Sequence, residues 1–287
     1  MRMGTEEEIR RPLWQRGRSR EVNRRRGFAE TISGQPRQLL VDEFHTDQRH
    51  APSRTPRGKS YLDEHRMGFP QCDVPSGRHE ENLMMALFNE GSMQLPGGDH
   101  VWILDYQTPL CARRSDGAGK IDATGLTPRG SLCLMELKSP SDNKGDSPLR
   151  ALLECLSYAA AERSNHADIV AEIGAHPERR HFDKFVDGRS TVLVFGPKTW
   201  WDYWVDLGPA GVWRPPLEDL SEYLARELNI DIAFGALEGF EFTPDDHGTR
   251  LRQPRIRGEA RMVPVPGLPA LHSMPAPNHA PVSGATS

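Results

Sequence analysis

The chain has 287 residues, of which 37% are hydrophobic and 26% are charged, and its formal net charge is −4. This length suits one medium-sized domain with extensions, or two small domains. A weakly acidic chain has no overall positive field that would draw it to nucleic acid, so any such attraction must come from local patches. No apolar run approaches the roughly 20 residues that a membrane-spanning helix needs, which predicts a cytoplasmic protein without a membrane partner.

Residues 1–60 have the composition of a basic, largely disordered extension. Nine arginines stand against four glutamates between Met1 and Arg26. Residues 243–287 are rich in proline and small residues and show little apolar periodicity, which is typical of a disordered tail. Only residues 261–265 suggest a short strand there. We therefore expect one folded domain over residues 61–242.

The central segment predicts a mixture of helices and strands. A helix follows Ser76, a suitable N-cap, and runs through Asn89. Another helix follows Ser147, with Pro148 at its first position. Apolar and β-branched runs predict strands over residues 101–107, 120–126, 132–138 and 191–195. The order of helix, three strands, helix and strand predicts an α/β fold with a mixed central sheet flanked by helices.

Two acidic residues and a lysine lie on neighbouring predicted strands. Asp122 lies in the second strand, and Glu136 and Lys138 end the third, after an apolar run. Residues two apart in a strand face the same side, so Glu136 and Lys138 emerge together. A tight turn over residues 127–130 can bring Asp122 beside them. Because buried charges must be paired or coordinated, this arrangement predicts a site for Mg²⁺ or Mn²⁺ with an adjacent ammonium.

An aspartate, a spacer and Glu-x-Lys on consecutive strands resemble the motif of the PD-(D/E)xK nucleases, which have the restriction-endonuclease-like fold. The similar region covers somewhat under half of the chain. The resemblance implies that Asp122, Glu136 and the backbone carbonyl of Leu137 bind the metal. It also implies that Lys138 orients the attacking water or stabilises the charged phosphate.

In this family a third acidic group usually comes from the first helix. Glu81 is our first choice, Glu80 the second and His79 the third, because helical periodicity does not separate the two glutamates. The plainer interpretation is that both glutamates only favour the N-terminus of the helix, where negative charge is stabilising.

Three secondary candidates lie elsewhere in the motif. Glu154 and Tyr158, four apart in the later helix, resemble the glutamine and tyrosine of the RecB-like branch, with glutamate in place of glutamine. Gln107 ends the first strand and can point toward the site. An ordinary polar strand end explains Gln107 equally well, and Tyr158 can be a half-buried core residue.

Two further residue groups have both a functional and a structural interpretation. Five aromatic residues could stack unpaired bases, but packing of a helix against the sheet is favoured because aromatic side chains dominate cores. They are Trp200, Trp201, Tyr203, Trp204 and Trp213. The four cysteines have no metal-binding spacing and are expected to be buried thiols. They are Cys72, Cys111, Cys133 and Cys155.

The sequence therefore favours a Mg²⁺-dependent nuclease that hydrolyses phosphodiester bonds, with DNA preferred to RNA as its partner. A second hypothesis is a non-catalytic module of the same fold that binds nucleic acid or a partner protein. A third is an unrelated α/β protein in which the acids and the lysine coincide by chance. Assembly as a homodimer or with a partner protein is left open.

Overall fold

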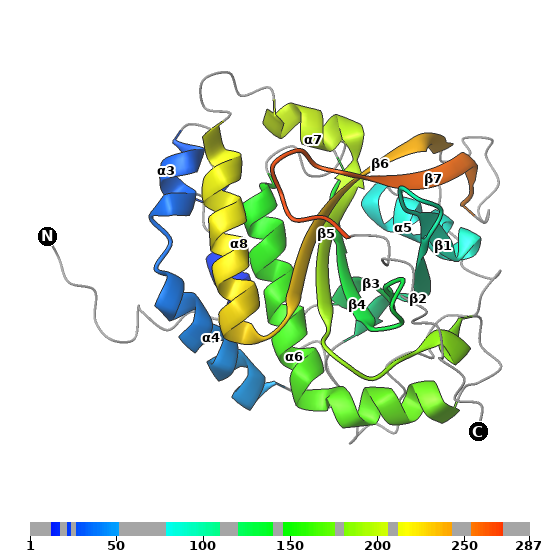
Figure 1. Cartoon of the computed structure of the whole chain (residues 1–287), viewed down its shortest axis with the longest axis horizontal. Coiled ribbons are helices and arrows are strands. Elements are labelled where there is room, and N and C mark those ends of the chain that lie inside the picture. The colour runs from blue at the N-terminus through cyan, green and yellow to red at the C-terminus, as the bar shows by residue number, and fades with distance from the viewer. Residues whose placement is uncertain are drawn as a thin grey trace, which may run out of the picture.

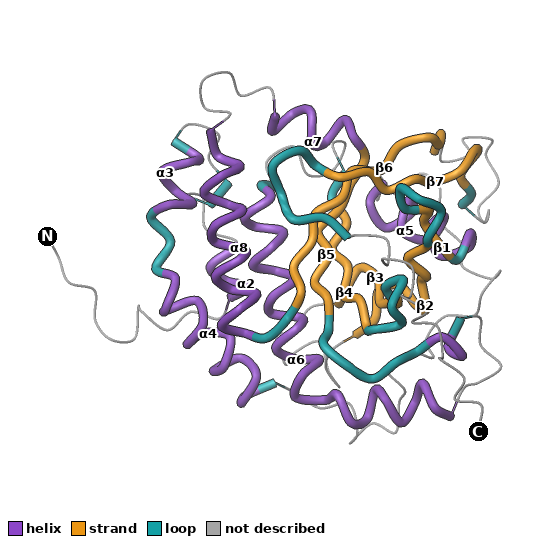
Figure 2. Tube along the Cα trace, viewed as in Figure 1, coloured by secondary structure: helices purple, strands orange, loops and turns teal. Residues whose placement is uncertain are grey.

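The computed structural model describes residues 13–17, 22–23, 27–51, 79–109, 120–139, 146–175, 181–205, 212–242 and 254–271 (Figures 1 and 2). Its helices are α2 (Leu13–Gly17), α3 (Phe28–Ser33), α4 (Arg37–His50), α5 (His79–Glu90), α6 (Pro148–Ala175), the 3₁₀ helix η3 (Phe182–Lys184), α7 (Lys198–Val205) and α8 (Arg214–Leu228). Its strands are β1 (Ser92–Gln94), β2 (His100–Pro109), β3 (Lys120–Leu126), β4 (Leu132–Leu137), β5 (Thr191–Pro197), β6 (Asp231–Phe242) and β7 (Ile256–Pro264).

The strands form a closed barrel in the order β1-β2-β3-β4-β5-β6-β7. Pairing is antiparallel from β1 through β4 and parallel from β4 through β6. β7 runs antiparallel to β6 and parallel to β1, where Gln94 pairs with Arg261. This last pairing closes the sheet on itself.

The expected restriction-endonuclease-like fold, with its open mixed sheet flanked by helices, is wrong. The pairing of β7 with β1 turns the sheet into a closed barrel of seven strands. Periodicity reports which face of an element is apolar, and it carries no information about which distant strands pair. Closure joins residues 94 and 261, so no local pattern could have shown it.

The individual helices and strands that we predicted for the central segment are confirmed. β3 covers residues 120–126 as expected, and β2, β4 and β5 differ from their predicted limits by at most two residues. Ser147 caps α6 because its Oγ accepts a hydrogen bond from the N–H of Arg150 at 3.0 Å, with Pro148 at the first helical position. The other predicted cap, Ser76, lies outside the described residues.

Two segments that we expected to be disordered extensions contain regular structure. α3 and α4, within residues 1–60, pack against α8, and α4 also packs against α6 (Figure 1). Their buried residues include Phe28 and Phe44. Beyond residue 242, β7 completes the barrel, which confirms the short strand expected near residues 261–265. The overall composition of these segments is polar and rich in proline, so it did not indicate helices or strands. A few apolar residues at helical spacing are nevertheless enough for a helix to pack on the core.

Two hydrophobic clusters lie on the two faces of the sheet. One joins the face that α6 covers to α3, α4, α7 and α8, which form layers of helices beside the sheet in Figures 1 and 2. The other joins the opposite face to α5 and the inner residues of β7. β4 and β5 are buried on both faces, as parallel central strands usually are.

The aromatic cluster is part of the core. Trp200, Trp204 and Trp213 are fully buried, and Trp201 is nearly so. The indole N–H of Trp201 donates to the carbonyl of Gly235 at 2.8 Å. Packing against the sheet is thus confirmed for the tryptophans. Two of the cysteines, Cys133 and Cys155, are buried free thiols as expected, whereas Cys72 and Cys111 lie outside the described residues.

None of the helices in the described ranges is long and apolar enough to cross a bilayer.

Close packing between β2, β3 and β4 makes Gly125 intolerant of any side chain. A β-carbon at this position would lie 2.1 Å from the Trp102 carbonyl oxygen and 2.2 Å from Cε of Met135. We expect Gly125→Ala to lower the free energy of unfolding by about 4 kcal/mol, since overpacking would force a backbone shift. Chemical denaturation measures this loss.

The matched control is Gly174→Ala in α6, where a β-carbon meets no atom within 4 Å. This change is expected to stabilise the protein by about 0.5–1 kcal/mol, because alanine favours the helix. Equal effects of the two substitutions would contradict the packing described around β3.

A histidine links α6 to the segment before β5. His166 contacts Glu162 through Nδ1 at 2.6 Å and Asp187 through Nε2 at 2.8 Å. The second oxygen of Glu162 accepts a hydrogen bond from Ser190 at 3.2 Å. The hydrogen bond to Glu162, together with Asp187, raises the pKa of His166 from 6.5 to about 9.

A raised histidine pKa contributes stability that is complete below pH 6.5 and lost as the pH rises through about 9. We expect His166→Gln to lower the free energy of unfolding by about 1 kcal/mol at pH 6, a value reduced for the partial exposure of the pair. The difference from wild type should vanish at pH 10. His50→Gln, at the exposed end of α4, is the control, and a pH-independent loss for His166→Gln would contradict the assignment.

Candidate active site

Asp122 and Glu136 lie opposite each other on neighbouring strands. β3 and β4 are antiparallel, with Ala123 paired to Met135, so one further step of the same register sets Asp122 across from Glu136. Directly opposed residues have β-carbons about 4.5–5.5 Å apart on one face of a sheet. That face is the one covered by α6, because Leu134, two residues before Glu136, packs into the cluster with α6.

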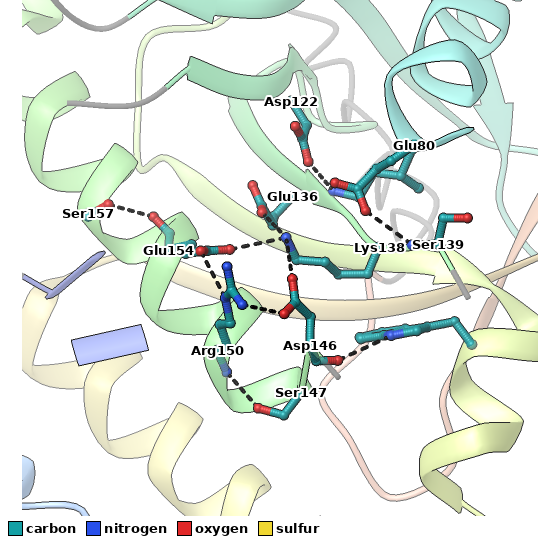
Figure 3. A network of polar contacts seen from close by, with 12 residues as sticks. Glu80, Asp122, Glu136, Lys138, Ser139, Asp146, Ser147, Arg150, Glu154 and Ser157 are labelled. Carbon is teal, nitrogen blue, oxygen red and sulfur yellow. Dashed lines mark hydrogen bonds and ion pairs between the residues drawn. The ribbon is translucent and has the colours of Figure 1, made fainter. Parts of the chain in front are cut away.

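Lys138 lies against Glu136 at the end of β4. Its Nζ is 2.5 Å from Oε1 of Glu136 and 3.1 Å from Oε2 of Glu154. Glu136 and Lys138 are each 3% exposed. Figure 3 shows these side chains converging from β3, β4 and α6 on one region. The structure thus brings together the three residues on which the sequence argument depends.

Backbone and amide groups hold Asp122 in place. Its Oδ2 accepts the N–H of Leu137 at 3.0 Å, and its Oδ1 accepts Nε2 of Gln107 at 3.1 Å. Gln107 has a φ of 49°, which is uncommon for a residue with a side chain. In an extended strand the N–H and C=O of one residue face the same neighbour. The carbonyl of Leu137 therefore faces β3 and Asp122, as a metal ligand would need to.

Glu80, from α5, belongs to this region. Its Oε2 accepts the backbone N–H of Ser139 at 3.2 Å (Figure 3), and its charge acts on both Glu136 and Lys138. Burial and Asp105 raise the pKa of Tyr106, and the charge of Glu81, our first choice, adds to that rise. His79 is the first residue of α5 and is partly buried. The structure thus places the second choice, Glu80, closest to the metal-binding candidates.

α6 contributes more residues than the sequence suggested. Glu154 contacts Lys138, and Tyr158 lies one turn further along, where Glu136 and Asp122 influence its ionisation. Asp146 and Arg150 also belong to the cluster and were not among our candidates. The sequence carries a signal for them, because Arg150 and Glu154 are four apart on one face of α6 and Asp146 lies four residues before Arg150, just ahead of the helix.

Burial and crowding of the acids shift their pKa values. Burial, opposed in part by Lys138, raises the pKa of Asp122 from 3.8 to about 6. Burial and the Asp122 carboxylate raise the pKa of Glu136 well above its usual range. Glu154 behaves differently: burial is outweighed by Lys138 and Arg150, so its pKa is lowered. Burial would lower the pKa of Lys138, but Glu136 and Glu154 raise it. The cluster is therefore rich in negative charge and retains protons.

One feature of the oxygen atoms in this cluster fits the binding of a hard cation. Oε2 of Glu136 is buried and accepts no hydrogen bond from the residues that the structure describes, and a buried carboxylate oxygen without a donor invites a cation. Mg²⁺ typically uses one or two carboxylates and keeps several waters. Across the described ranges, no three His, Cys, Asp or Glu side chains are arranged to hold one ion. Asp122, Glu136 and the carbonyl of Leu137 would hold it.

A separate cavity of about 330 Å³ opens at the other end of the parallel strands. Its wall includes Thr127, Arg129, Thr191 and Asp231, which lie where β4, β5 and β6 begin. Thr127 bonds to a neighbouring serine hydroxyl at 2.8 Å, so part of its polar wall is already satisfied internally. The cavity lacks the convergence of acids and a lysine that is found at the end of β4. We therefore take the acidic cluster as the candidate active site.

Comparison with known proteins found no match to a protein-family model, to a curated protein or to a solved structure.

The raised pKa of Asp122 makes its ionisation unfavourable for the metal-free protein. A carboxyl whose pKa is raised contributes stability that is complete below pH 3.8 and lost as the pH rises through about 6. Asp122→Asn removes that loss, so the metal-free variant should be more stable than wild type above pH 6 by about 2 kcal/mol. Its advantage should shrink toward pH 4.

Thermal unfolding in the presence of a chelator, at pH values between 4 and 8, measures this difference. Asp168→Asn, at an exposed position of α6, is the matched control and should leave the melting temperature unchanged. An Asp122→Asn variant that loses stability across the whole range would show that Asp122 is a structural hydrogen-bond acceptor alone.

Proposed function

We propose that the protein is a metal-dependent nuclease that hydrolyses phosphodiester bonds, with DNA as the favoured substrate. The observation that carries the proposal is the opposed pair Asp122 and Glu136, with the ammonium of Lys138 2.5 Å from Glu136 and one buried oxygen of Glu136 that receives no hydrogen bond from the described residues. Hydrolysis of a phosphodiester needs ligands for a hard cation and a positive group near the developing charge, and this cluster supplies both.

Each residue has a distinct part in such a reaction. Asp122, Glu136 and the carbonyl of Leu137 would hold Mg²⁺ or Mn²⁺, which would polarise a phosphoryl oxygen and lower the pKa of a bound water. Lys138 donates hydrogen bonds to the charge that grows on the phosphate as the water oxygen attacks phosphorus. As the water attacks, one of its protons passes to solvent. The bond from phosphorus to the leaving oxygen then breaks, and that oxygen takes up a proton from solvent. Gln107 and the N–H of Leu137 fix the direction in which Asp122 points.

The pKa values of the cluster support exchange of protons for a cation. Asp122 and Glu136 hold protons more tightly than free carboxyls, because their negative charges repel each other in a buried place. A divalent cation relieves that repulsion and displaces the protons. Metal affinity should therefore rise with pH through about 6, where Asp122 loses its proton.

The second candidate function is a module that binds nucleic acid or a partner protein without cleaving it. One observation favours it: among the residues that the structure describes, no three metal-binding side chains are preassembled around one point. Calorimetry with Mn²⁺ separates the two functions, because a non-catalytic module has no need of the ion. Stoichiometric binding that Asp122→Ala abolishes supports the nuclease.

Purified protein is expected to cleave at least one substrate in a panel of double-stranded, single-stranded and branched DNA and RNA, in Mg²⁺ or Mn²⁺. Asp122→Ala, Glu136→Gln and Lys138→Ala should each lower the rate by at least about 100-fold, as loss of transition-state charge stabilisation commonly does. Asp168→Asn is the control and should cleave like wild type. Undiminished cleavage by all three site variants would show that the activity lies elsewhere.

A further inference from the structure

The ammonium of Lys138 is surrounded by three carboxylates. Its Nζ is 2.5 Å from Glu136, 3.1 Å from Glu154 and 3.9 Å from Asp146 (Figure 3). Glu136 comes from the same strand, whereas Glu154 and Asp146 come from α6 and the residue pair before it. If Glu136 serves as a metal ligand, the two acids of the α6 segment are the contacts that keep Lys138 at the site.

Arg150 connects those two acids. Its Nη1 pairs with Oδ1 of Asp146, and its Nε donates to Oε1 of Glu154 at 3.1 Å. Glu154 thus presents one oxygen to Arg150 and the other to Lys138. Arg150 and Glu154 are four apart on α6 and are therefore neighbours on its surface, and Asp146, two residues before the helix begins, pairs with Arg150. These three residues form a ladder beside Lys138. Arg150 pairs directly with Asp146 and Glu154, and Glu136 acts on it as a nearby charge.

Two other parts of the chain hold the start of this ladder. Oγ of Ser147 donates to the carbonyl of Val22 at 2.7 Å, and the N–H of Ser147 donates to Oδ1 of Asn23 at 3.1 Å. The indole of Trp200, from α7, donates to the carbonyl of Asp146 at 3.3 Å. The ladder is therefore fixed at its base, which suits it to hold a neighbouring side chain in one position.

We propose that Arg150 is a positioning residue for Lys138, acting through Glu154 and Asp146 without touching the metal or the scissile phosphate. This inference rests on the proposed nuclease function and deepens it. A lysine side chain has many rotamers. Supporting contacts raise the rate of a reaction by holding such a side chain within a fraction of an ångström of its working position.

The test compares Arg150→Ala, Arg150→Lys and wild type on whichever nucleic acid the wild type cleaves. Arg150→Ala is expected to lower kcat by about 100-fold, the usual cost of a small misplacement, with the KM for the nucleic acid unchanged. Mn²⁺ affinity, measured by calorimetry without substrate, should also stay unchanged. Arg150→Lys should recover at least about ten-fold, because lysine can still bridge to one acid. Arg163→Ala, on the same helix, is the matched control with wild-type kcat.

A double-mutant cycle separates positioning of Lys138 from an independent role. In the Lys138→Ala background, Arg150→Ala should have no further effect on the residual rate. An equal loss in both backgrounds, or a raised KM with unchanged kcat, would overturn the inference, the latter because it indicates direct contact with substrate. If Arg150→Ala fails to fold, Glu154→Gln is measured instead, with the same expected loss of kcat and the same cycle.

The outcomes also separate this inference from the proposed function. A wild type that cleaves, with Arg150 and Glu154 variants that keep its kcat, overturns the positioning role and leaves the nuclease intact. A wild type that cleaves no nucleic acid in the panel overturns both.

Discussion

The buried ion pair between Lys138 and Glu136 is the interaction on which the site depends. Both side chains are only 3% exposed, and a buried charge is tolerated only when its partner is close and well placed. The ammonium offsets repulsion among acids that come from β4 and α6, so it holds two separate elements in one arrangement. The repulsion among these buried acids is what the proposed divalent cation would relieve.

The barrel provides the frame for this pairing. Antiparallel register between β3 and β4 sets the two acids opposite each other, and parallel pairing with β5 continues to Lys138, whose N–H donates to the carbonyl of Phe195 at 2.9 Å. α6 covers that face with apolar side chains, and Arg150 and Glu154 in its first two turns lie beside the end of β4. Hydrophobic packing thus fixes the positions of the strands and helices, and a few polar residues at their ends form the candidate site.

Local features were predictable from the sequence, and long-range ones were not. Apolar runs located β3 and β4, the cap at Ser147 located α6, and the spacing of Asp122 and Glu136 predicted their convergence. Barrel closure escaped prediction because β1 has three residues and pairs with a strand far along the chain. Glu80 and Glu81 could not be distinguished because neighbouring residues at the start of a helix differ only in the direction in which their side chains point. Asp146 and Arg150 were missed because charges at helical spacing are usually solvent-facing pairs.

The pairing of β7 with β1 has a consequence for how the protein is made. The chain must be synthesised through residue 264 before the barrel can close. Contacts between residues as distant in sequence as those of β1 and β7 slow folding. Until then β1 and β6 each present an unpaired edge, and exposed edges invite pairing with other chains. Forms of the chain that lack β7 therefore carry two exposed strand edges and are expected to aggregate more readily than the closed barrel.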